Sequence, residues 1–129
     1  MRINQTHFIL YVSNQTQSKD FYTALLGYEP LFSVPGMTEF WLTSNTKLGL
    51  MPNDGIAKII TPALPHPQQA NGTPRCELYW YVDDVEQAFN HALTCGATLV
   101  SAISERNWGD LAGYVADADG HVIAFAQKL

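Results

Sequence analysis

The chain repeats one pattern of apolar and polar positions. Residues 5–12 are rich in β-branched and aromatic types, which is typical of a strand, and they lead into a stretch at 15–26 with apolar residues at helical spacing. The same order returns about 70 positions later, with a strand pattern at 77–84 and a helical pattern at 85–95. A repeat of this length divides the chain into two similar modules.

Each predicted helix has a start signal and a stop signal. Asn14 and Asp84 precede the helices and can accept hydrogen bonds from the first turn, and Gly27 and Gly96 supply the left-handed residue that ends a helix. Short strand-like runs then follow near 28–33, 38–42 and 46–51 in the first half, and near 98–103, 112–117 and 121–127 in the second. The pattern therefore predicts an α+β fold that contains the order β-α-β-β-β twice.

The two modules are joined by a proline-rich segment. Residues 52–75 contain five of the seven prolines, which predicts an extended surface connection between module one at about 1–51 and module two at about 76–129. The dipeptide Asp119-Gly120 predicts a primed turn between the last two strands. With 129 residues the chain is long enough for one core, so we expect a single domain over 1–129.

Composition excludes several classes of partner. The chain has 7 basic and 12 acidic side chains, and its lysines and arginines form no cluster, so it lacks the charge pattern of a nucleic-acid surface. It also lacks an apolar run long enough for a membrane span or a signal peptide. We therefore expect a cytoplasmic protein without a nucleic-acid or membrane partner.

Three motifs carry a resemblance to a known group of proteins. The segments YVSNQTQSKDFYTALLGYEP, YVDDVEQAFNHALTCGA and WGDLAGYVADADGHVIAF together make the chain resemble the vicinal-oxygen-chelate superfamily, which contains glyoxalase I, extradiol dioxygenases and bleomycin-resistance proteins. The resemblance implies that the two modules form a curved, cleft-enclosing mixed sheet with helices on its outer face. It also implies a homodimer.

The resemblance places a divalent metal at four inner positions, which here are His7, Gly49, Glu77 and Ala124. Glycine and alanine side chains offer no ligand atom, whereas a catalytic metal normally needs three protein ligands. We therefore predict no metal and no other cofactor. The remaining histidines, His66, His91 and His121, are expected to be solvated or capping.

With two of the four ligand positions lost, the chain most resembles the bleomycin-resistance type of this superfamily, which binds a planar drug without converting it. Strand alternation places Tyr11, Tyr79 and Tyr81 on inner faces, Trp41 is expected there too, and Trp108 and Tyr114 are candidate wall or lid residues. Large aromatic faces favour stacking on a flat ligand.

The predicted site of this binding protein therefore comprises His7, Tyr11, Trp41, Gly49, Glu77, Tyr79, Trp108, Tyr114 and Ala124. We favour a metal-independent binding protein for a small planar or cationic aromatic compound, sequestered as in antibiotic resistance.

Glu77 leaves an alternative open. On a central inner strand a carboxylate would lose solvation, so Glu77 either anchors a ligand amine, acts as a general base, or pairs internally with His7, Lys47 or Arg75. The catalytic version predicts a lyase, isomerase or dioxygenase-type enzyme that uses Glu77 as its base or a metal held by His7 and Glu77.

Overall fold

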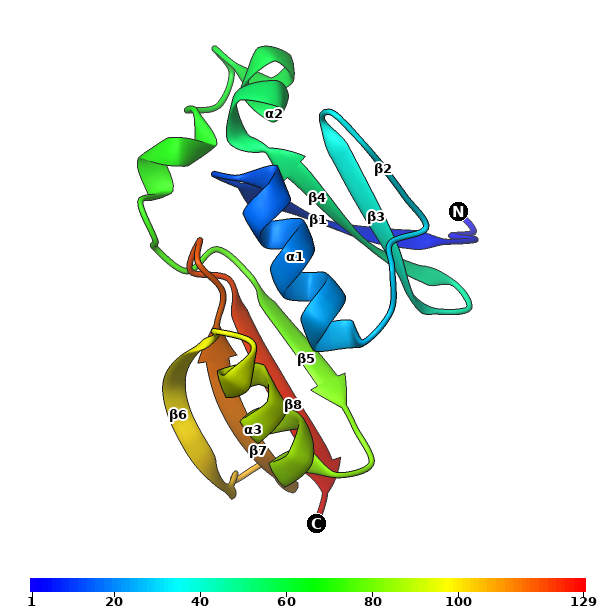
Figure 1. Ribbon diagram of the computed structural model, residues 1–129, viewed down its shortest axis with the longest axis vertical. Coiled ribbons are helices and arrows are strands. Elements are labelled where there is room, and N and C mark those ends of the chain that lie inside the picture. Colours follow the sequence, from blue (N-terminus) through cyan, green and yellow to red (C-terminus); the bar gives the residue numbers. More distant parts are fainter. The chain divides into compact units, whose positions relative to one another are not determined.

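The computed structural model describes residues 1–129, and the chain divides into two compact units, Met1–Gln69 and Ala70–Leu129. The first unit contains β1 (Thr6–Val12), α1 (Gln15–Leu26), β2 (Phe32–Val34), β3 (Met37–Thr43), β4 (Thr46–Pro52) and α2 (Asn53–Ile60). The second contains β5 (Glu77–Tyr81), α3 (Val85–Thr94), β6 (Thr98–Glu105), β7 (Asp110–Ala116) and β8 (Val122–Lys128), and the 3-10 helix η1 (Pro67–Ala70) crosses the boundary (Figure 1).

Each unit forms its own four-stranded mixed sheet. The strand orders are β1-β4-β3-β2 and β5-β8-β7-β6, so β1 and β5 lie at equivalent edges of their sheets. β1 pairs in parallel with β4, and β5 pairs in parallel with β8. All other neighbouring strands in the two sheets are antiparallel. The predicted α+β fold with two β-α-β-β-β repeats is confirmed.

The helix signals read from the sequence are confirmed as well. Asn14 Oδ1 accepts from the Gln17 N–H over 2.9 Å, and the Asp84 side chain accepts from Gln87 in the same way over 3.0 Å. Gly27 has a φ of 81°, which places it in the left-handed region expected at a helix end. None of the helices is both long and apolar enough to cross a membrane.

The connection between the modules is not the extended segment that its prolines suggested. Asn53–Ile60 forms α2, which has Asp54 in its first turn and Lys58 in its last, as the helix dipole favours. Ile56 and Ala57 are buried on one side of this helix. The prolines at 62, 65 and 67 follow α2 rather than interrupt it, so they do not prevent a helix at 53–60.

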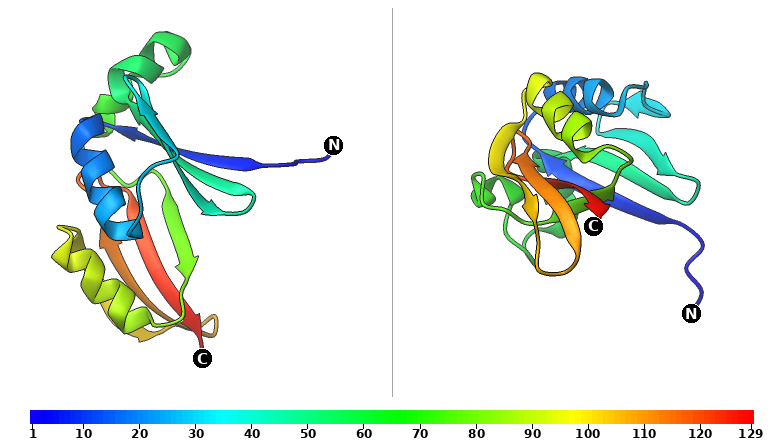
Figure 2. Two further views of the ribbon diagram at one scale, coloured as in Figure 1. Left: turned by 45° about the vertical axis from the view of Figure 1, so that its right-hand side comes forward. Right: turned by 90° about the horizontal axis from the view of Figure 1, so that it is seen from below.

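In the second unit α3 lies along one face of the sheet (Figure 2). Gly113 on β7 faces this helix, because a Cβ there would lie 2.7 Å from the Phe89 ring. Phe125 pairs with Gly113 and with Trp80, and its ring lies 6.1 Å from that of Trp80. Trp80 therefore faces the helix side of the sheet, and the neighbouring residues on each strand point to the opposite face.

The turn between β7 and β8 differs from the predicted primed turn. Gly120 is the residue with positive φ, at 84°, whereas Asp119 is not among the non-glycine residues with positive φ. The Gly120 N–H donates to Asp117 O, and the Asp117 N–H donates to His121 O. This is the longer hairpin loop, with a turn followed by a left-handed glycine, and not a two-residue turn.

Candidate functional site

Three residues predicted to contact a ligand lie in one row across the second unit's sheet, on the face opposite α3. Tyr79 on β5 pairs with Ala124 on β8, and Ala124 pairs with Tyr114 on β7. Paired residues point to the same face, so both tyrosine side chains and the fully buried methyl group of Ala124 share this face. Because the alanine side chain is only a methyl group, it does not fill the space above β8 between the two tyrosine side chains.

Two tyrosines from β5 reach across the sheet to one carboxylate on β7. The hydroxyl groups of Tyr79 and Tyr81 both donate to Asp110 Oδ2, each over 2.7 Å. Neighbouring strands are about 4.8 Å apart, so β5 and β7, with β8 between them, are about 10 Å apart. Ala126 on β8 pairs with Tyr81 and is small enough to leave room for this reach.

Two further side chains complete the group. Trp108, in the loop before β7, donates its Nε1–H to the Tyr79 hydroxyl over 2.9 Å. Lys128 Nζ donates to the Tyr81 hydroxyl over 2.9 Å and lies 3.5 Å from Asp110 Oδ1. We call Tyr79, Tyr81, Trp108, Asp110 and Lys128 the Asp110 cluster.

The Asp110 cluster combines a buried anion with exposed rings. Asp110 is 0% exposed, whereas Tyr81 is 54% and Trp108 57% exposed. The two tyrosines occupy Asp110 Oδ2, but Oδ1 is buried and accepts no hydrogen bond. A carboxylate can accept about four hydrogen bonds, so Oδ1 keeps unused capacity for a donor.

The protonation states in this cluster follow from its hydrogen bonds. Donation by Tyr81 and Tyr79 lowers the pKa of Asp110 below its ordinary value, and this outweighs the effect of burial. Burial raises the pKa of Tyr79, and the bond to Tyr81 raises the pKa of Lys128. At neutral pH Asp110 is therefore an anion, Tyr79 a neutral donor and Lys128 a cation.

The lowered pKa of Asp110 predicts a pH dependence of stability. Because the folded state holds the ionised form more strongly than the unfolded state, the contribution of Asp110 is complete above the ordinary carboxyl pKa of about 4 and disappears as the pH falls through the lower folded value. Urea unfolding of the wild type and Asp110→Asn between pH 2.5 and 7 checks this. The difference in free energy of unfolding between the wild type and Asp110→Asn should become smaller at acidic pH. A difference that is constant across this range would contradict a lowered pKa for Asp110.

Tyr114, the third tyrosine on this face, has a separate partner. The Arg106 guanidinium lies 5.0 Å from the centre of its ring and is fixed by bonds to Ala112 O, Ala102 O and the Ser101 hydroxyl. Burial raises the pKa of Tyr114, so its hydroxyl stays protonated at neutral pH. Tyr114 is therefore packed against a fixed guanidinium beside the Asp110 cluster, and its predicted ligand contact stays a prediction.

The first unit holds the other predicted aromatic contacts. Trp41 on β3 lies beside Lys47, whose ammonium is 4.6 Å from the ring centre and 3.3 Å from Glu39 Oε1. Trp41 and Lys47 are paired in register, so they share the face that also carries Tyr11 and His7 on β1. The predicted ligand contacts of Trp41, Tyr11 and His7 stay predictions.

The four positions where the resemblance placed a metal do not fit one. His7 is exposed, and its Nε2 lies 2.7 Å from Gln5 Oε1. Gly49 does not leave open space: a Cβ there would lie 2.6 Å from Ile9 Cδ1, so the isoleucine already occupies that volume. Ala124 presents a buried methyl group, and neither it nor Gly49 has a ligand atom.

Glu77 is not in the desolvated environment that its sequence position suggested. It is the first residue of β5, which is an edge strand of its sheet and not a central one, and its side chain is exposed. Water therefore solvates the carboxylate directly. Its predicted roles as ligand anchor or general base stay predictions.

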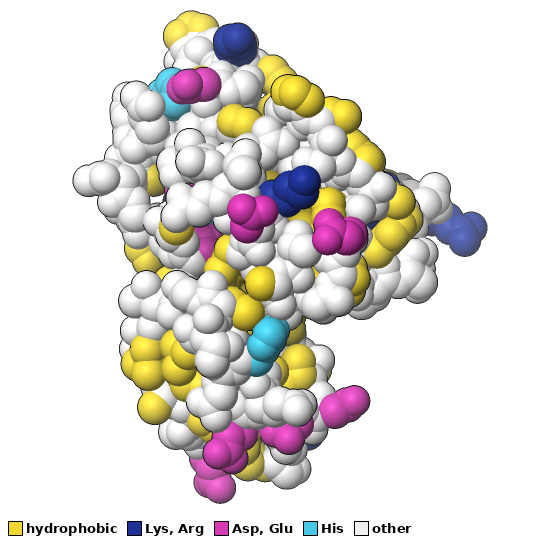
Figure 3. All heavy atoms as spheres, in the orientation of Figure 1, with side chains coloured by type: hydrophobic (Ala, Val, Ile, Leu, Met, Phe, Trp, Pro, Cys, Tyr) yellow, Lys and Arg dark blue, Asp and Glu magenta, His cyan; other side chains and the backbone are white.

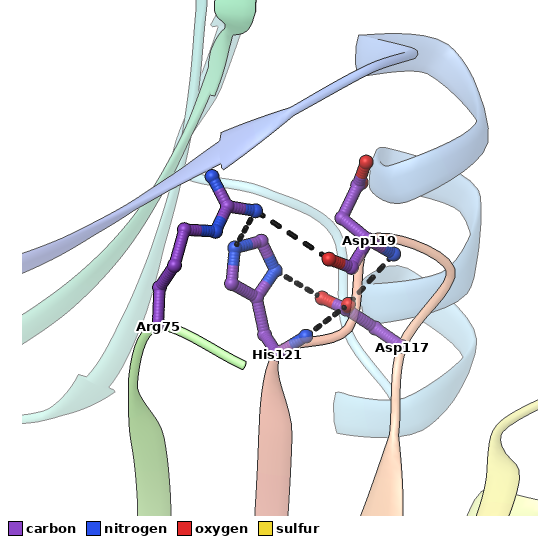
Figure 4. Close-up of polar contacts among 4 residues, drawn as sticks. All are labelled: Arg75, Asp117, Asp119 and His121. Carbon is purple, nitrogen blue, oxygen red and sulfur yellow. Dashed lines mark hydrogen bonds and ion pairs between the residues drawn. The ribbon is translucent and has the colours of Figure 1, made fainter. Parts of the chain in front are cut away.

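A second group of ionisable side chains lies at the β7–β8 loop, and its members hydrogen-bond to one another and to the loop backbone (Figure 4). His121 is 2% exposed, which corrects the expectation of a solvated or capping histidine. Its Nδ1 lies 2.8 Å from Asp117 Oδ2, and Arg75 Nη2 lies 3.0 Å from its Nε2.

Arginine can only donate, so Nε2 is an acceptor and Nδ1 carries the proton toward Asp117. Asp117, Asp119 and His121 have ligand atoms within 4.8 Å of one another, but the Arg75 guanidinium occupies the free lone pair of His121 that a metal ion would need. The loop is fixed by Arg75 and does not present a cation site.

Comparison with known proteins agrees with the fold. Residues 4–125 match the profile of the Glyoxalase/Bleomycin resistance protein/Dioxygenase superfamily. An uncharacterised protein of Mycobacterium bovis is 31% identical over 123 residues, which cover 93% of this chain and 80% of that protein.

Solved structures with the same fold include a glyoxalase-related enzyme from Fulvimarina pelagi, with a TM-score of 0.79 and 21% identity over 94% of this chain and 85% of the other. A glyoxalase/bleomycin resistance protein/dioxygenase from Nocardioides has a TM-score of 0.81 and 19% identity over 100% of this chain and 85% of the other. With 122 of its 129 residues inside the family match, the chain belongs to the Glyoxalase/Bleomycin resistance protein/Dioxygenase superfamily.

Proposed function

We propose that this protein binds a small organic molecule with a planar aromatic part at the Asp110 cluster, without a metal ion. The observation that carries the proposal is Asp110 Oδ1, a buried carboxylate oxygen that accepts no hydrogen bond next to exposed aromatic rings. The nearest donor to this oxygen is the largely exposed Lys128 ammonium at 3.5 Å, so its burial is incompletely compensated, and a ligand N–H or O–H placed there would supply the missing hydrogen bond.

The rings around Asp110 suit a flat ligand. Tyr79 and Tyr81 make an edge contact with ring centres 5.5 Å apart, so their faces point in different directions. Trp108 and Tyr81 remain largely exposed. Each aromatic contact with a ligand ring contributes on the order of 0.5–1.5 kcal/mol beyond area burial, so two or three such contacts add usefully to one polar anchor.

The chemistry of the chain's own residues supports binding without a metal. Gly49 and Ala124 supply no donor atoms at two of the four expected ligand positions, and Ile9 fills the space at one of them. Glu77 is exposed and offers no observation in favour of catalysis. Sequestration of a drug, the homodimer and the cytoplasmic location stay predictions from the sequence.

Calorimetric titration tests the proposal. Protein freed of metal with a chelator should bind a flat aromatic probe such as 2-naphthylmethylammonium saturably, with one site per chain. Trp108→Phe removes the Nε1–H that fixes Tyr79 and should weaken this binding, whereas Trp80→Phe, on the opposite face of the sheet, should change it little. The proposal fails if no member of a panel of flat aromatic cations and neutral compounds binds the chelator-treated protein.

A further inference from the structure

We infer that the Asp110 cluster recognises an ammonium group, and that Lys128 is an internal occupant of the ammonium position which a ligand displaces. This inference rests on the proposed function and specifies the chemical class of its ligand. It also gives Lys128 a role, since no ligand contact was expected from this residue.

The lysine ammonium occupies the position that a ligand ammonium would take. Lys128 Nζ lies 3.5 Å from Asp110 Oδ1, 2.9 Å from the Tyr81 hydroxyl and 4.6 Å from the centre of the Tyr81 ring. A carboxylate beside an aromatic face is the usual combination for binding a cation. The cluster therefore already binds a primary ammonium group, supplied by its own chain.

Lys128 is a weak occupant. Its side chain is 73% exposed, while the Asp110 side chain is fully buried. Exposed lysine pairs contribute little, because solvent screens them and a long flexible side chain loses entropy when it is held in one place. A ligand that brings an ammonium together with a stacking ring has a second source of affinity that the lysine lacks, so it can displace Lys128 from Asp110 Oδ1.

The distribution of charge favours a cation in this unit. Ala70–Leu129 carries three basic and eight acidic side chains, whereas Met1–Gln69 carries four of each, so the formal net charge of −5 belongs entirely to the second unit. Figure 3 shows acidic side chains gathered at the end of this unit where α3 begins.

Asp83, Asp84 and Glu86 are exposed there, directly after the end of β5 that carries Tyr81. Such a surface concentrates cations near the cluster and disfavours anions.

Paired probes test the inference by calorimetry. 2-Naphthylmethylammonium and the neutral 2-naphthylmethanol have the same ring, and the wild type should bind the ammonium compound more tightly. Lys128→Ala should raise the affinity for the ammonium probe about two- to fivefold, the range expected for removal of an exposed competing pair, and leave the alcohol unchanged. Lys128→Arg keeps a cation in competition and should bind like the wild type.

Lys58→Ala is the matched control, since it removes one positive charge from an exposed position on α2. Its affinity for both probes should equal that of the wild type. Equal binding of the two probes to the wild type, or an ammonium affinity that falls or stays the same in Lys128→Ala, would overturn the inference and leave the proposed function intact. Failure of both probes to bind any variant would overturn the inference, and failure of the whole panel of aromatic compounds would overturn the proposed function as well.

Discussion

Asp110→Asn is expected to lower the affinity for 2-naphthylmethylammonium at least about tenfold, because hydrogen bonds to charged groups are among the stronger ones in proteins. The substitution keeps the shape of the side chain but removes its charge and replaces one carboxylate oxygen with an amide nitrogen. Tyr79 and Tyr81 already share the single oxygen Oδ2, so both could still donate to the amide oxygen, but they would lose the anion that orients them. Calorimetric titration at neutral pH measures the change.

Asp83→Asn provides the control for Asp110→Asn. Asp83 is an exposed acid in the same unit that does not belong to the Asp110 cluster, so its substitution makes the same change of net charge without altering the cluster itself. Its affinity should remain close to that of the wild type, and the circular dichroism spectra of both variants should show that they are folded. Equal losses in the two variants would mean that net charge, and not the position of Asp110, controls binding.

The largest loss of stability is expected from Gly120→Ala, at about 2–4 kcal/mol. Gly120 has a φ of 84°, and a Cβ there would lie 2.2 Å from the carbonyl oxygen of Gly72. The neighbouring contact between Arg75 and His121 holds the same two segments together, so the loop cannot move away without breaking it. Urea unfolding measures the free energy lost.

Gly96→Ala separates backbone strain from this close contact. Gly96 also has a positive φ, at 103°, but a Cβ there would meet nothing within 4 Å. Its substitution should cost only the strain of a left-handed alanine, about 1–2 kcal/mol. If Gly120→Ala costs no more than Gly96→Ala, the close packing of the 72–75 segment on the β7–β8 loop is not what stabilises this part of the unit.

Local signals were sufficient to predict most of the fold from the sequence. Asn14 and Gly27 mark the ends of the first helix by well-understood backbone chemistry, and the structure confirms both. The helix at 53–60 was missed because the surrounding prolines were given more weight than its own pattern. Its signals were present: Ile56, Ile59 and Ile60 at helical spacing, with an acid at the start and a lysine at the end.

The site was predicted less completely than the fold. Strand alternation correctly placed Tyr79 and Tyr81 on one face, and the same alternation, continued along β7 and β8, would have added Asp110 and Lys128. Asp110 directly follows Gly109, and this pair of residues is also typical of a turn, so its position alone does not predict an inner residue of the strand.

The hydrogen bond from Tyr79 to Asp110 could not be predicted, since it depends on the strand order β5-β8-β7 and joins residues 31 positions apart. The exposure of Glu77 had the same cause, because sequence alone does not show that β5 is an edge strand.

The most direct test of metal-free binding at the Asp110 cluster is an NMR titration of the protein in the presence of a chelator. The three tryptophan indole N–H signals report on separate places: Trp41 on β3, Trp80 on the face of β5 opposite the cluster, and Trp108 in the cluster. Addition of 2-naphthylmethylammonium should move the Trp108 signal saturably and leave the Trp80 signal in place. An unmoved Trp108 signal, or a shift that appears only after a divalent metal is added, would contradict metal-free binding at this cluster.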